Sequence, residues 1–389
     1  MTQAPTQPGA VLTKPPFLRA PEASRTILLV IFACACLPLA AGVFFFGWRV
    51  IILTAISVAT CVGVESIYYR LTRQPALRRR THAALMGLLL ALTLPPFVPW
   101  YVPLAGGVIA IVIGKAIFGG VGHFLWQPAL VGRLAVVVLF APPLWSVVEL
   151  TRPAWPVLAV NRVITGDIAN VRPAERYVSW RDTQATGSND AFELPTPRKI
   201  LRELTTDQAR PPESIGEQLA KLPSAWDIIV GAYGGGIGET CSLAILCAGL
   251  YLIYRNYVNG YLSGMMILAA AVTAAVAPVR TAAGDFRWLP LLIEGSDVGF
   301  LYVVYQVLAG ELLLSAFFLA PEMTSRPVTA PAQGIFGLLC GGLGMLLALY
   351  TSIPIPFYAA VLACNTLTPV LDGIRPRVLG QRRWWQKKS

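Results

Sequence analysis

The chain has 389 residues, of which 55% are hydrophobic and only 13% are charged, and its formal net charge at pH 7 is +11. Because soluble globular proteins contain about 25% charged residues, this composition excludes an ordinary soluble protein and predicts an integral membrane protein. The positive charge is concentrated at 70–80 and near the C-terminus. This distribution indicates positive residues that set the membrane topology and also contact lipid, and it argues against binding of nucleic acid.

Ten apolar stretches follow one another along the chain and are candidates for membrane helices. A helix needs about 20 apolar residues to cross a hydrocarbon core about 30 Å thick. Five stretches precede a long polar segment, and five follow it. The stretches are residues 26–46, 48–69, 82–97, 101–118, 128–149, 236–254, 260–279, 299–319, 334–350 and 354–373.

The odd number of stretches on each side of the polar segment predicts the architecture. With five spans in each half, the second half enters the membrane in the opposite orientation, as in an inverted repeat. We therefore predict an all-α polytopic membrane protein with about ten transmembrane helices, arranged as two five-helix inverted repeats. The parts are an N-terminal tail (1–25), a first membrane half (26–149), an extracytoplasmic insert (150–233), a second membrane half (234–373) and a basic tail (374–389).

Charges in the links between the stretches predict the orientation. Positive residues gather at 70–80 and 375–388, whereas the short links of the opposite side contain only Arg49, Arg280 and Arg287. Lys and Arg accumulate in short cytoplasmic loops. Both termini are therefore expected in the cytoplasm, with the insert outside a bacterial inner membrane.

Proline-rich links follow the third stretch of each half, at 94–103 and 320–331. Paired interruptions at corresponding positions point to broken helices around a central site. The alternative is that these prolines simply end helices at the membrane interface.

A first glycine cluster, with Gly119, Gly120 and Gly122, follows Lys115 at the end of the fourth stretch. Glycines allow backbone amides to close on an anionic or planar ligand. They also allow helices to pack closely, which is the common reason for glycine in membranes. These three glycines are candidate ligand-binding residues, with close packing as the alternative.

A second glycine run, Gly234 to Thr240, lies where the chain returns from the polar insert to an apolar stretch. It contains Gly236, Gly238 and the carboxylate of Glu239. A carboxylate near a helix N-terminus is favoured by the helix dipole, and ionisable groups within membranes usually serve ions, protons or cofactors. Glu239 is therefore a candidate functional residue, and a helix cap is the alternative.

Further ionisable residues occur at or within the apolar stretches. Glu311 is the most central of them and is the first candidate for a proton or cation path. The alternative is a structural pair of Glu311 with a residue such as Arg133. The others are Glu65, Lys115 and Glu149.

Cysteines and histidines predict no metal site. All seven cysteines fall in apolar stretches, without a Cys-x-x-Cys motif, and buried free cysteine usually behaves as a small hydrophobic residue. The only histidines, His82 and His123, argue against a haem held by two histidines of this chain alone. No phosphate-binding loop or dinucleotide fingerprint follows a predicted strand, which argues against ATP or NADH as a ligand.

Five segments, in this order, resemble the NqrB/RnfD family, whose members are membrane subunits of the sodium-pumping NADH:quinone oxidoreductase (Nqr) and of the Rnf complex. The resemblance covers the chain from about residue 80 to 373. The segments are Leu92-Thr93-Leu94-Pro95-Pro96; Lys115 to Gly122 with Pro128-Ala129; Gly236-Ile237-Gly238-Glu239-Thr240; Ala316-Phe317-Phe318 through Pro327-Val328-Thr329-Ala330-Pro331 to Gly337; and Asn365 to Asp372.

The resemblance implies a flavin-dependent membrane subunit of an ion-translocating oxidoreductase, a translocase. Family members carry an FMN esterified to a threonine of the central outer loop, and often a second flavin held noncovalently among the helices. One-electron relay by flavin, positioned and tuned by the protein, would be coupled to Na⁺ or H⁺ movement. Partners would be other membrane, flavin and iron–sulfur subunits. In this chain Thr196 would be the attachment residue, Glu239 and Glu311 would belong to the ion path, and the candidate flavin contacts would be Gly119, Gly120, Gly122, Gly236, Gly238 and Thr240.

The insert departs from the family's flavin-attachment motif, Asp-x-x-Ser/Thr-Gly-Ala-Thr. Asp190, Thr196 and Pro197 are retained, but Glu193-Leu194-Pro195 replaces the Ser/Thr-Gly-Ala core. Gly-Ala would let a flavin transferase approach the backbone, whereas Leu-Pro is bulky and stiff. Simple loop structure is therefore the alternative for this segment. A second register, from Asp182 to Ser188, ends in a possible hydroxyl acceptor but is no closer to the motif.

Two other functions remain open. One is a divergent relative without covalent flavin, acting as a scaffold or ion-path subunit of a related complex. The other is a solute channel or transporter that uses the inverted-repeat pore.

Overall fold

The described part of the chain is almost entirely helical. A computed structural model describes residues 23–73, 80–96, 98–140, 201–202, 215–220, 222, 225–231, 235–280, 285–293 and 295–373. Within these ranges, strand occurs only as an antiparallel pair of two-residue strands, β1 (Val279–Arg280) and β2 (Phe286–Arg287), in which Val279 lies opposite Arg287.

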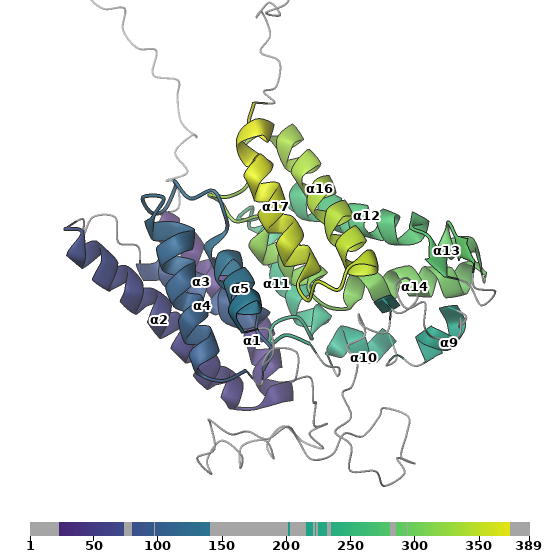
Figure 1. The fold of residues 1–389 in the computed structure, drawn as a ribbon, viewed down its shortest axis with the longest axis horizontal. Coiled ribbons are helices and arrows are strands. Elements are labelled where there is room, and N and C mark those ends of the chain that lie inside the picture. Colours follow the sequence, from purple (N-terminus) through teal and green to yellow (C-terminus); the bar gives the residue numbers. More distant parts are fainter. Residues whose placement is uncertain are drawn as a thin grey trace, which may run out of the picture.

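The first half forms a compact group of helices (Figure 1). Its fourth helix continues directly into a π-helix, η2. The helices are α1 (Ser24–Phe46), α2 (Arg49–Leu71), α3 (Arg80–Thr93), α4 (Tyr101–Ile111) with η2 (Val112–Ala116), and α5 (Pro128–Leu139).

The second half forms a second group, and α11 lies between the two groups beside α1 (Figure 1). One of its helices is bent by 56° between α14 and the α15–η4 segment. Three short helices, α9, α10 and α13, lie at its margin. The helices are α9 (Ile215–Ala220), α10 (Ala225–Val230), α11 (Ser242–Tyr254), α12 (Gly260–Val276), α13 (Pro290–Ile293), α14 (Ser296–Leu308), α15 (Leu312–Leu314) with the π-helix η4 (Ser315–Leu319), α16 (Ala330–Tyr350) and α17 (Pro356–Leu371).

Each of the ten predicted apolar stretches contains a helix, but not each helix is a full span. Among the described helices, α1, α2 and α16 are long and apolar enough to cross a membrane, and the bent pair of α14 with α15–η4 would be a fourth. Six further apolar helices have 10–17 residues. The structure thus supports a helical membrane protein, whereas ten full spans and the inverted repeat stay predictions.

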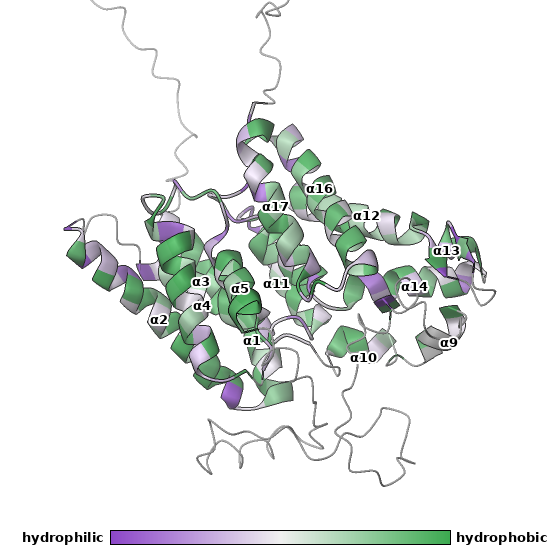
Figure 2. Cartoon of the chain, in the orientation of Figure 1, coloured by the Kyte–Doolittle hydropathy of each residue, from purple (hydrophilic) through white to green (hydrophobic). Residues whose placement is uncertain are grey.

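Many large apolar side chains are exposed on the helix surfaces, as the hydrophobic outer faces in Figure 2 show. Phe44 on α1, Phe300 on α14 and Val370 on α17 are 57%, 65% and 71% exposed. Soluble monomers rarely expose large contiguous apolar patches, so these faces are suited to lipid.

The two halves are joined by backbone hydrogen bonds between two of the segments that carry the family resemblance. The amide of Ile237 donates to the carbonyl of Leu94 (2.9 Å), and the amide of Gly238 donates to the carbonyl of Leu92 (2.8 Å). A Cβ at Gly238 would lie 2.7 Å from the Cβ of Leu92, so glycine permits this approach. Because the segment forms this joint as a turn, α11 begins at Ser242, six residues later than the predicted stretch.

Helices α12 and α16 cross closely because α16 presents glycine at the contact. A Cβ at Gly341 would lie 2.0 Å from the carbonyl oxygen of Met266. The neighbouring Gly342 has only the hydroxyl of Thr273 within reach, at 3.7 Å.

Gly341→Val is therefore expected to destabilise the protein by about 2 kcal/mol or more, because overpacking a close contact forces backbone shifts. Thermal unfolding of the purified protein in detergent measures this loss. Gly342→Val is the matched control, since it carries the same cost in helix propensity without the clash. Equal unfolding midpoints for the two variants would contradict this packing.

Candidate functional site

Four buried polar side chains lie near one another beside the joint between the halves. They come from the turn before α11, the break between α14 and α15, α17 and α5. We call this group the acidic junction, and it consists of Glu239, Glu311, Tyr358 and Arg133, which are 7%, 5%, 0% and 6% exposed.

The carboxylate of Glu239 is held by its own turn and by α17. One oxygen, Oε2, accepts a hydrogen bond from the amide of Gly236 (3.1 Å). The other, Oε1, accepts a short hydrogen bond from the hydroxyl of Tyr358. A Cβ at Gly236 would lie within 2.8 Å of the Glu239 carboxyl, so this glycine makes room for the carboxylate.

Glu311 lies where the bent helix is interrupted. The preceding Gly310 has φ +89°, a left-handed conformation that glycine adopts readily. The Oε2 of Glu311 accepts a hydrogen bond from the amide of Phe357 (3.2 Å), in the first turn of α17. A carboxylate at this position interacts favourably with the α17 dipole.

Tyr358 lies among the charged side chains of the junction. Its ring is fully buried, and its hydroxyl lies close enough to interact with the charges of Glu239, Glu311 and Arg133. Arg133 is placed by α5, which packs against α17. Two of its nitrogens, Nε and Nη1, are buried and have no hydrogen-bond partner among the described residues.

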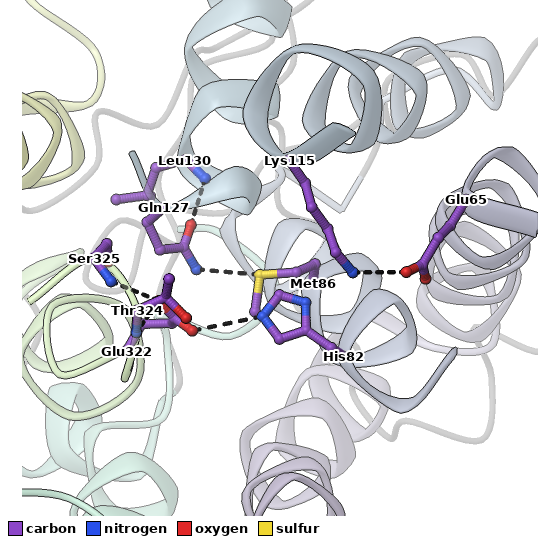
Figure 3. A network of polar contacts seen from close by, with 9 residues as sticks. All are labelled: Glu65, His82, Met86, Lys115, Gln127, Leu130, Glu322, Thr324 and Ser325. Carbon is purple, nitrogen blue, oxygen red and sulfur yellow. Dashed lines mark hydrogen bonds and ion pairs between the residues drawn. The ribbon is translucent and has the colours of Figure 1, made fainter. Parts of the chain in front are cut away.

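A second polar site contains a fully buried ion pair between α2 and η2 (Figure 3). The Nζ of Lys115 lies 2.8 Å from Oε1 of Glu65, and both side chains have 0% exposure. Lys115 is in the π-helical turn, and π-helical insertions frequently occur at functional sites. Each charge is matched by the other, which is the condition for burying either of them.

The second site continues across the two halves through His82 and Glu322 (Figure 3). The Nε2 of His82 lies 3.5 Å from Oε1 of Glu322. The other oxygen of Glu322 accepts hydrogen bonds from the amides of Thr324 (3.0 Å) and Ser325 (3.1 Å). The pair therefore connects α3 of the first half to the loop after η4 of the second.

Gln127 completes this site at the start of α5 (Figure 3). Its Oε1 accepts a hydrogen bond from the amide of Leu130 (2.8 Å), which caps the helix. Its Nε2 lies 3.7 Å from the sulfur of Met86, one helical turn from His82. We call Glu65, Lys115, His82, Glu322 and Gln127 the ion-pair network.

The acidic junction and the ion-pair network lie at opposite ends of α3. His82 is near the beginning of this helix, and the carbonyl of Leu92 near its end bonds to the turn of Glu239. With a rise of about 1.5 Å per residue, the two ends are roughly 15 Å apart along the helix axis.

The first glycine cluster forms a turn after η2. Gly119, Gly120 and Gly122 have φ values of +97°, +101° and +98°, which L residues with side chains rarely adopt. A Cβ at Gly120 would lie 2.6 Å from the hydroxyl of Tyr69. Backbone geometry and packing therefore account for these glycines, and a ligand at them stays a hypothesis.

The sequence-predicted residues are distributed over several places. Glu239, Glu311 and Gly236 meet in the acidic junction, and Lys115 and Glu65 meet in the ion-pair network. Thr240 is buried, and its hydroxyl has no hydrogen-bond partner among the described residues. Thr196, the surrounding segment 190–197, and Glu149 lie outside the described residues.

Sequence reasoning did not identify Tyr358 or the His82–Glu322 pair. Tyr358 is one aromatic residue in an apolar stretch, 119 residues from its partner Glu239. The only sequence signal at Glu322 is an acid within a proline-rich link, and its partner belongs to the other half.

Comparisons with known proteins match nearly the whole chain. The model of the NQR2, RnfD, RnfE family matches residues 11–380. The D subunit of the ion-translocating oxidoreductase complex of Halorhodospira halophila is 30% identical over 375 residues, or 95% of each chain. The D subunit of the Na(+)-translocating ferredoxin:NAD(+) oxidoreductase complex of Acetobacterium woodii is 27% identical over 92% of this chain and 91% of its own. The D subunit of the proton-translocating ferredoxin:NAD(+) oxidoreductase complex of Clostridium ljungdahlii is 28% identical over 96% of each chain.

Lys115→Met is expected to cost about 3–5 kcal/mol of stability, because it leaves the Glu65 charge buried without its partner. Thermal unfolding in detergent measures the loss. The double variant Glu65→Gln with Lys115→Met should recover most of it, since neither charge remains. A double variant that is as unstable as the single one would contradict a dominant charge-pairing effect.

Proposed function

The chain belongs to the NQR2, RnfD, RnfE family, and on this premise we propose that it is the membrane subunit, equivalent to RnfD, of a bacterial ion-translocating electron transport complex. In this proposal it relays electrons through flavin and couples the relay to movement of Na⁺ or H⁺. The names of similar proteins support either ion as the one that is moved, since one relative is described as Na(+)-translocating and another as proton-translocating.

The observation that carries the proposal is the acidic junction. Two carboxylates, Glu239 and Glu311, are buried together between apolar helices at the joint of the two halves. Carboxylates in such surroundings are costly, and they commonly mark ion or proton pathways. The hydrogen bonds from Tyr358 and from the amides of Gly236 and Phe357 hold them in place without neutralising them.

Unsatisfied polar groups near the ion-pair network fit a noncovalent flavin. The carboxamide of Asn365, the hydroxyl of Ser325 and Nδ1 of His82 are buried, and within the described part of the chain they have no hydrogen-bond partners. Asn365 lies one turn before Thr368, whose hydroxyl donates to the carbonyl of Ser325 (3.0 Å). An isoalloxazine ring offers donors and acceptors in one plane, so these three side chains would bind and orient it. The flavin itself would supply the one-electron chemistry.

We further propose an inner-membrane location with both termini in the cytoplasm and the insert outside. The charge bias of the short links supports this orientation. The acidic junction then lies toward the outer side, beside the link after α3, and the ion-pair network lies toward the cytoplasm. Other subunits of the complex would supply and remove the electrons.

A second candidate function is a subunit of a related complex without covalent flavin. Glu193-Leu194-Pro195, which stands in place of the small residues of the attachment motif, favours it. In that case the acidic junction would still serve the ion path, and any flavin would be noncovalent.

We expect Glu311→Gln to lower the ion uptake that electron transport drives, about tenfold or more, because coupling between linked sites typically has this size. The purified complex is reconstituted in liposomes for this measurement. Asp297→Asn is the matched control, because this acid is exposed on the first turn of α14. Uptake of Na⁺ is measured with radioactive sodium and uptake of H⁺ with a pH-sensitive dye. Unchanged uptake in Glu311→Gln would contradict a role of this carboxylate in the ion path.

Covalent flavin at Thr196 is tested by fluorescence of the denatured protein in a gel. A fluorescent band in the wild type that disappears in Thr196→Val, and persists in Thr186→Val, is the expected result. Absence of the band in the wild type would leave the second candidate function. Flavin extracted from the native protein would then report whether a noncovalent flavin is bound.

A further inference from the structure

His82 and Glu322 form a buried polar contact between the two halves, near the beginning of α3 (Figure 3). The imidazole Nε2 lies 3.5 Å from Oε1 of the carboxylate, and the two side chains are 1% and 8% exposed. A normal N–H···O hydrogen bond is about 2.7–3.2 Å long, so the two groups are adjacent without a close hydrogen bond. Histidine is charged only when both of its nitrogens carry a proton. The strength of this contact therefore depends on the protonation of His82.

The carboxylate of Glu322 is oriented to accept from the imidazole. Its Oε2 accepts hydrogen bonds from the amides of Thr324 (3.0 Å) and Ser325 (3.1 Å), and Oε1 faces His82 (Figure 3). Hydrogen bonds from two amides favour the ionised form of a carboxyl group. Glu322 thus presents a fixed acceptor oxygen to the other half of the molecule.

The imidazole of His82 can take up a proton without losing a hydrogen bond. Both of its nitrogens are buried, and neither has a hydrogen-bond partner within the described residues. The ring of Phe124 packs beside it, with the two ring centroids 5.6 Å apart. A proton on the imidazole would turn the contact with Glu322 into a charge-assisted hydrogen bond, which is shorter and about twice as strong as a neutral one.

The charged groups around His82 come from three parts of the structure. Glu65 of α2 and Lys115 of η2 lie near the imidazole as the buried ion pair described above. Glu322, in the loop after η4, is the carboxylate in direct contact with it, and Arg326 faces Glu322 from the same loop. These are the groups that set the pH dependence of the contact.

The opposite end of α3 is joined to the second half in a way that protonation does not change. There the amide of Gly238 donates to the carbonyl of Leu92 (2.8 Å), in the backbone joint between the halves. Neither of these backbone groups gains or loses a charge. Helix α3 therefore has a permanent joint at its end and a protonation-dependent contact near its beginning.

We propose that His82 and Glu322 form a proton-binding site that holds the two halves together near the beginning of α3 when the proton is bound. One proton is taken from water onto the imidazole, and the resulting imidazolium pairs with the carboxylate. When the proton returns to water, Glu322 keeps its two amide donors but attracts the neutral ring less strongly, which frees this end of α3 to separate from the second half. Protonation of histidine controls other protein interfaces in this way. The inference goes beyond the proposed function, since it depends on neither the flavin nor the ion path.

Proton binding is tested by ¹⁵N NMR of the full chain, labelled at histidine and purified through an affinity tag without histidine. The chain has two histidines, and the exposed His123 is the internal reference. Between about pH 8 and about pH 5, the His82 signal should change from neutral imidazole to imidazolium. In Glu322→Gln the ratio of protonated to neutral His82 at a given pH should fall about tenfold or more, because the neighbouring negative charge is lost. Glutamine keeps an acceptor oxygen for the two amides.

The effect on the contact between the halves is tested by a double-substitution cycle of thermal unfolding midpoints in detergent. At about pH 5, Glu322→Gln should lower the midpoint by about 2 °C or more beyond its effect in the His82→Gln background. At about pH 8 the two effects should be equal, since the imidazole is then neutral. His123→Gln is the matched control and should show no coupling to Glu322 at either pH.

Three results would overturn the proposal. The first is a His82 signal that stays neutral to the lowest pH at which His123 is protonated. This result needs no substitution, so it decides the matter even if the variants do not fold. The second is a ratio of protonated to neutral His82 that Glu322→Gln leaves unchanged. The third is a coupling that is the same at both pH values, as a merely structural contact predicts.

Discussion

The burial of charged groups among apolar helices is the constraint on which the rest of this structure depends. Without water, an ionised side chain needs a countercharge or strong hydrogen bonds. The Glu65–Lys115 pair meets this condition within the molecule, at 2.8 Å and 0% exposure. In the acidic junction, hydrogen bonds from Tyr358 and from the amides of Gly236 and Phe357 hold the carboxylates of Glu239 and Glu311. The ion pair fits a mainly structural role, whereas the role in ion movement proposed for the acidic junction rests on two acids buried among apolar helices.

The same constraint explains where the helices are interrupted. Backbone groups freed by a break must find partners inside the protein. After α3, the carbonyls of Leu92 and Leu94 accept from the amides of Gly238 and Ile237. The breaks thus form the joint between the halves, and this joint places Glu239 beside α17. Glycine is needed there for close approach, which is a sufficient reason for its presence even without a ligand.

Hydropathy was sufficient to locate all ten helical regions, because apolar length is what a membrane helix requires. Hydropathy was not sufficient to locate the ends of the helices. The predicted stretch 236–254 includes part of the glycine run before α11, although this run forms a turn. Glu239 and Glu311 could be singled out because acids are rare among apolar residues. Tyr358 and the His82–Glu322 pair could not, since their roles arise from contacts between distant parts of the chain that no local pattern encodes.

If the acidic junction lies on the ion path of the proposed function, reduction of the complex changes the charge state of the junction as the coupling ion binds or leaves. Infrared difference spectroscopy of the purified complex, oxidised against reduced, measures this directly. We predict a carboxyl or carboxylate band that depends on the concentration of the coupling ion and disappears when Glu239 or Glu311 is replaced by glutamine. A wild-type complex with no carboxyl signal on reduction, at any concentration of Na⁺ or H⁺, would contradict the account.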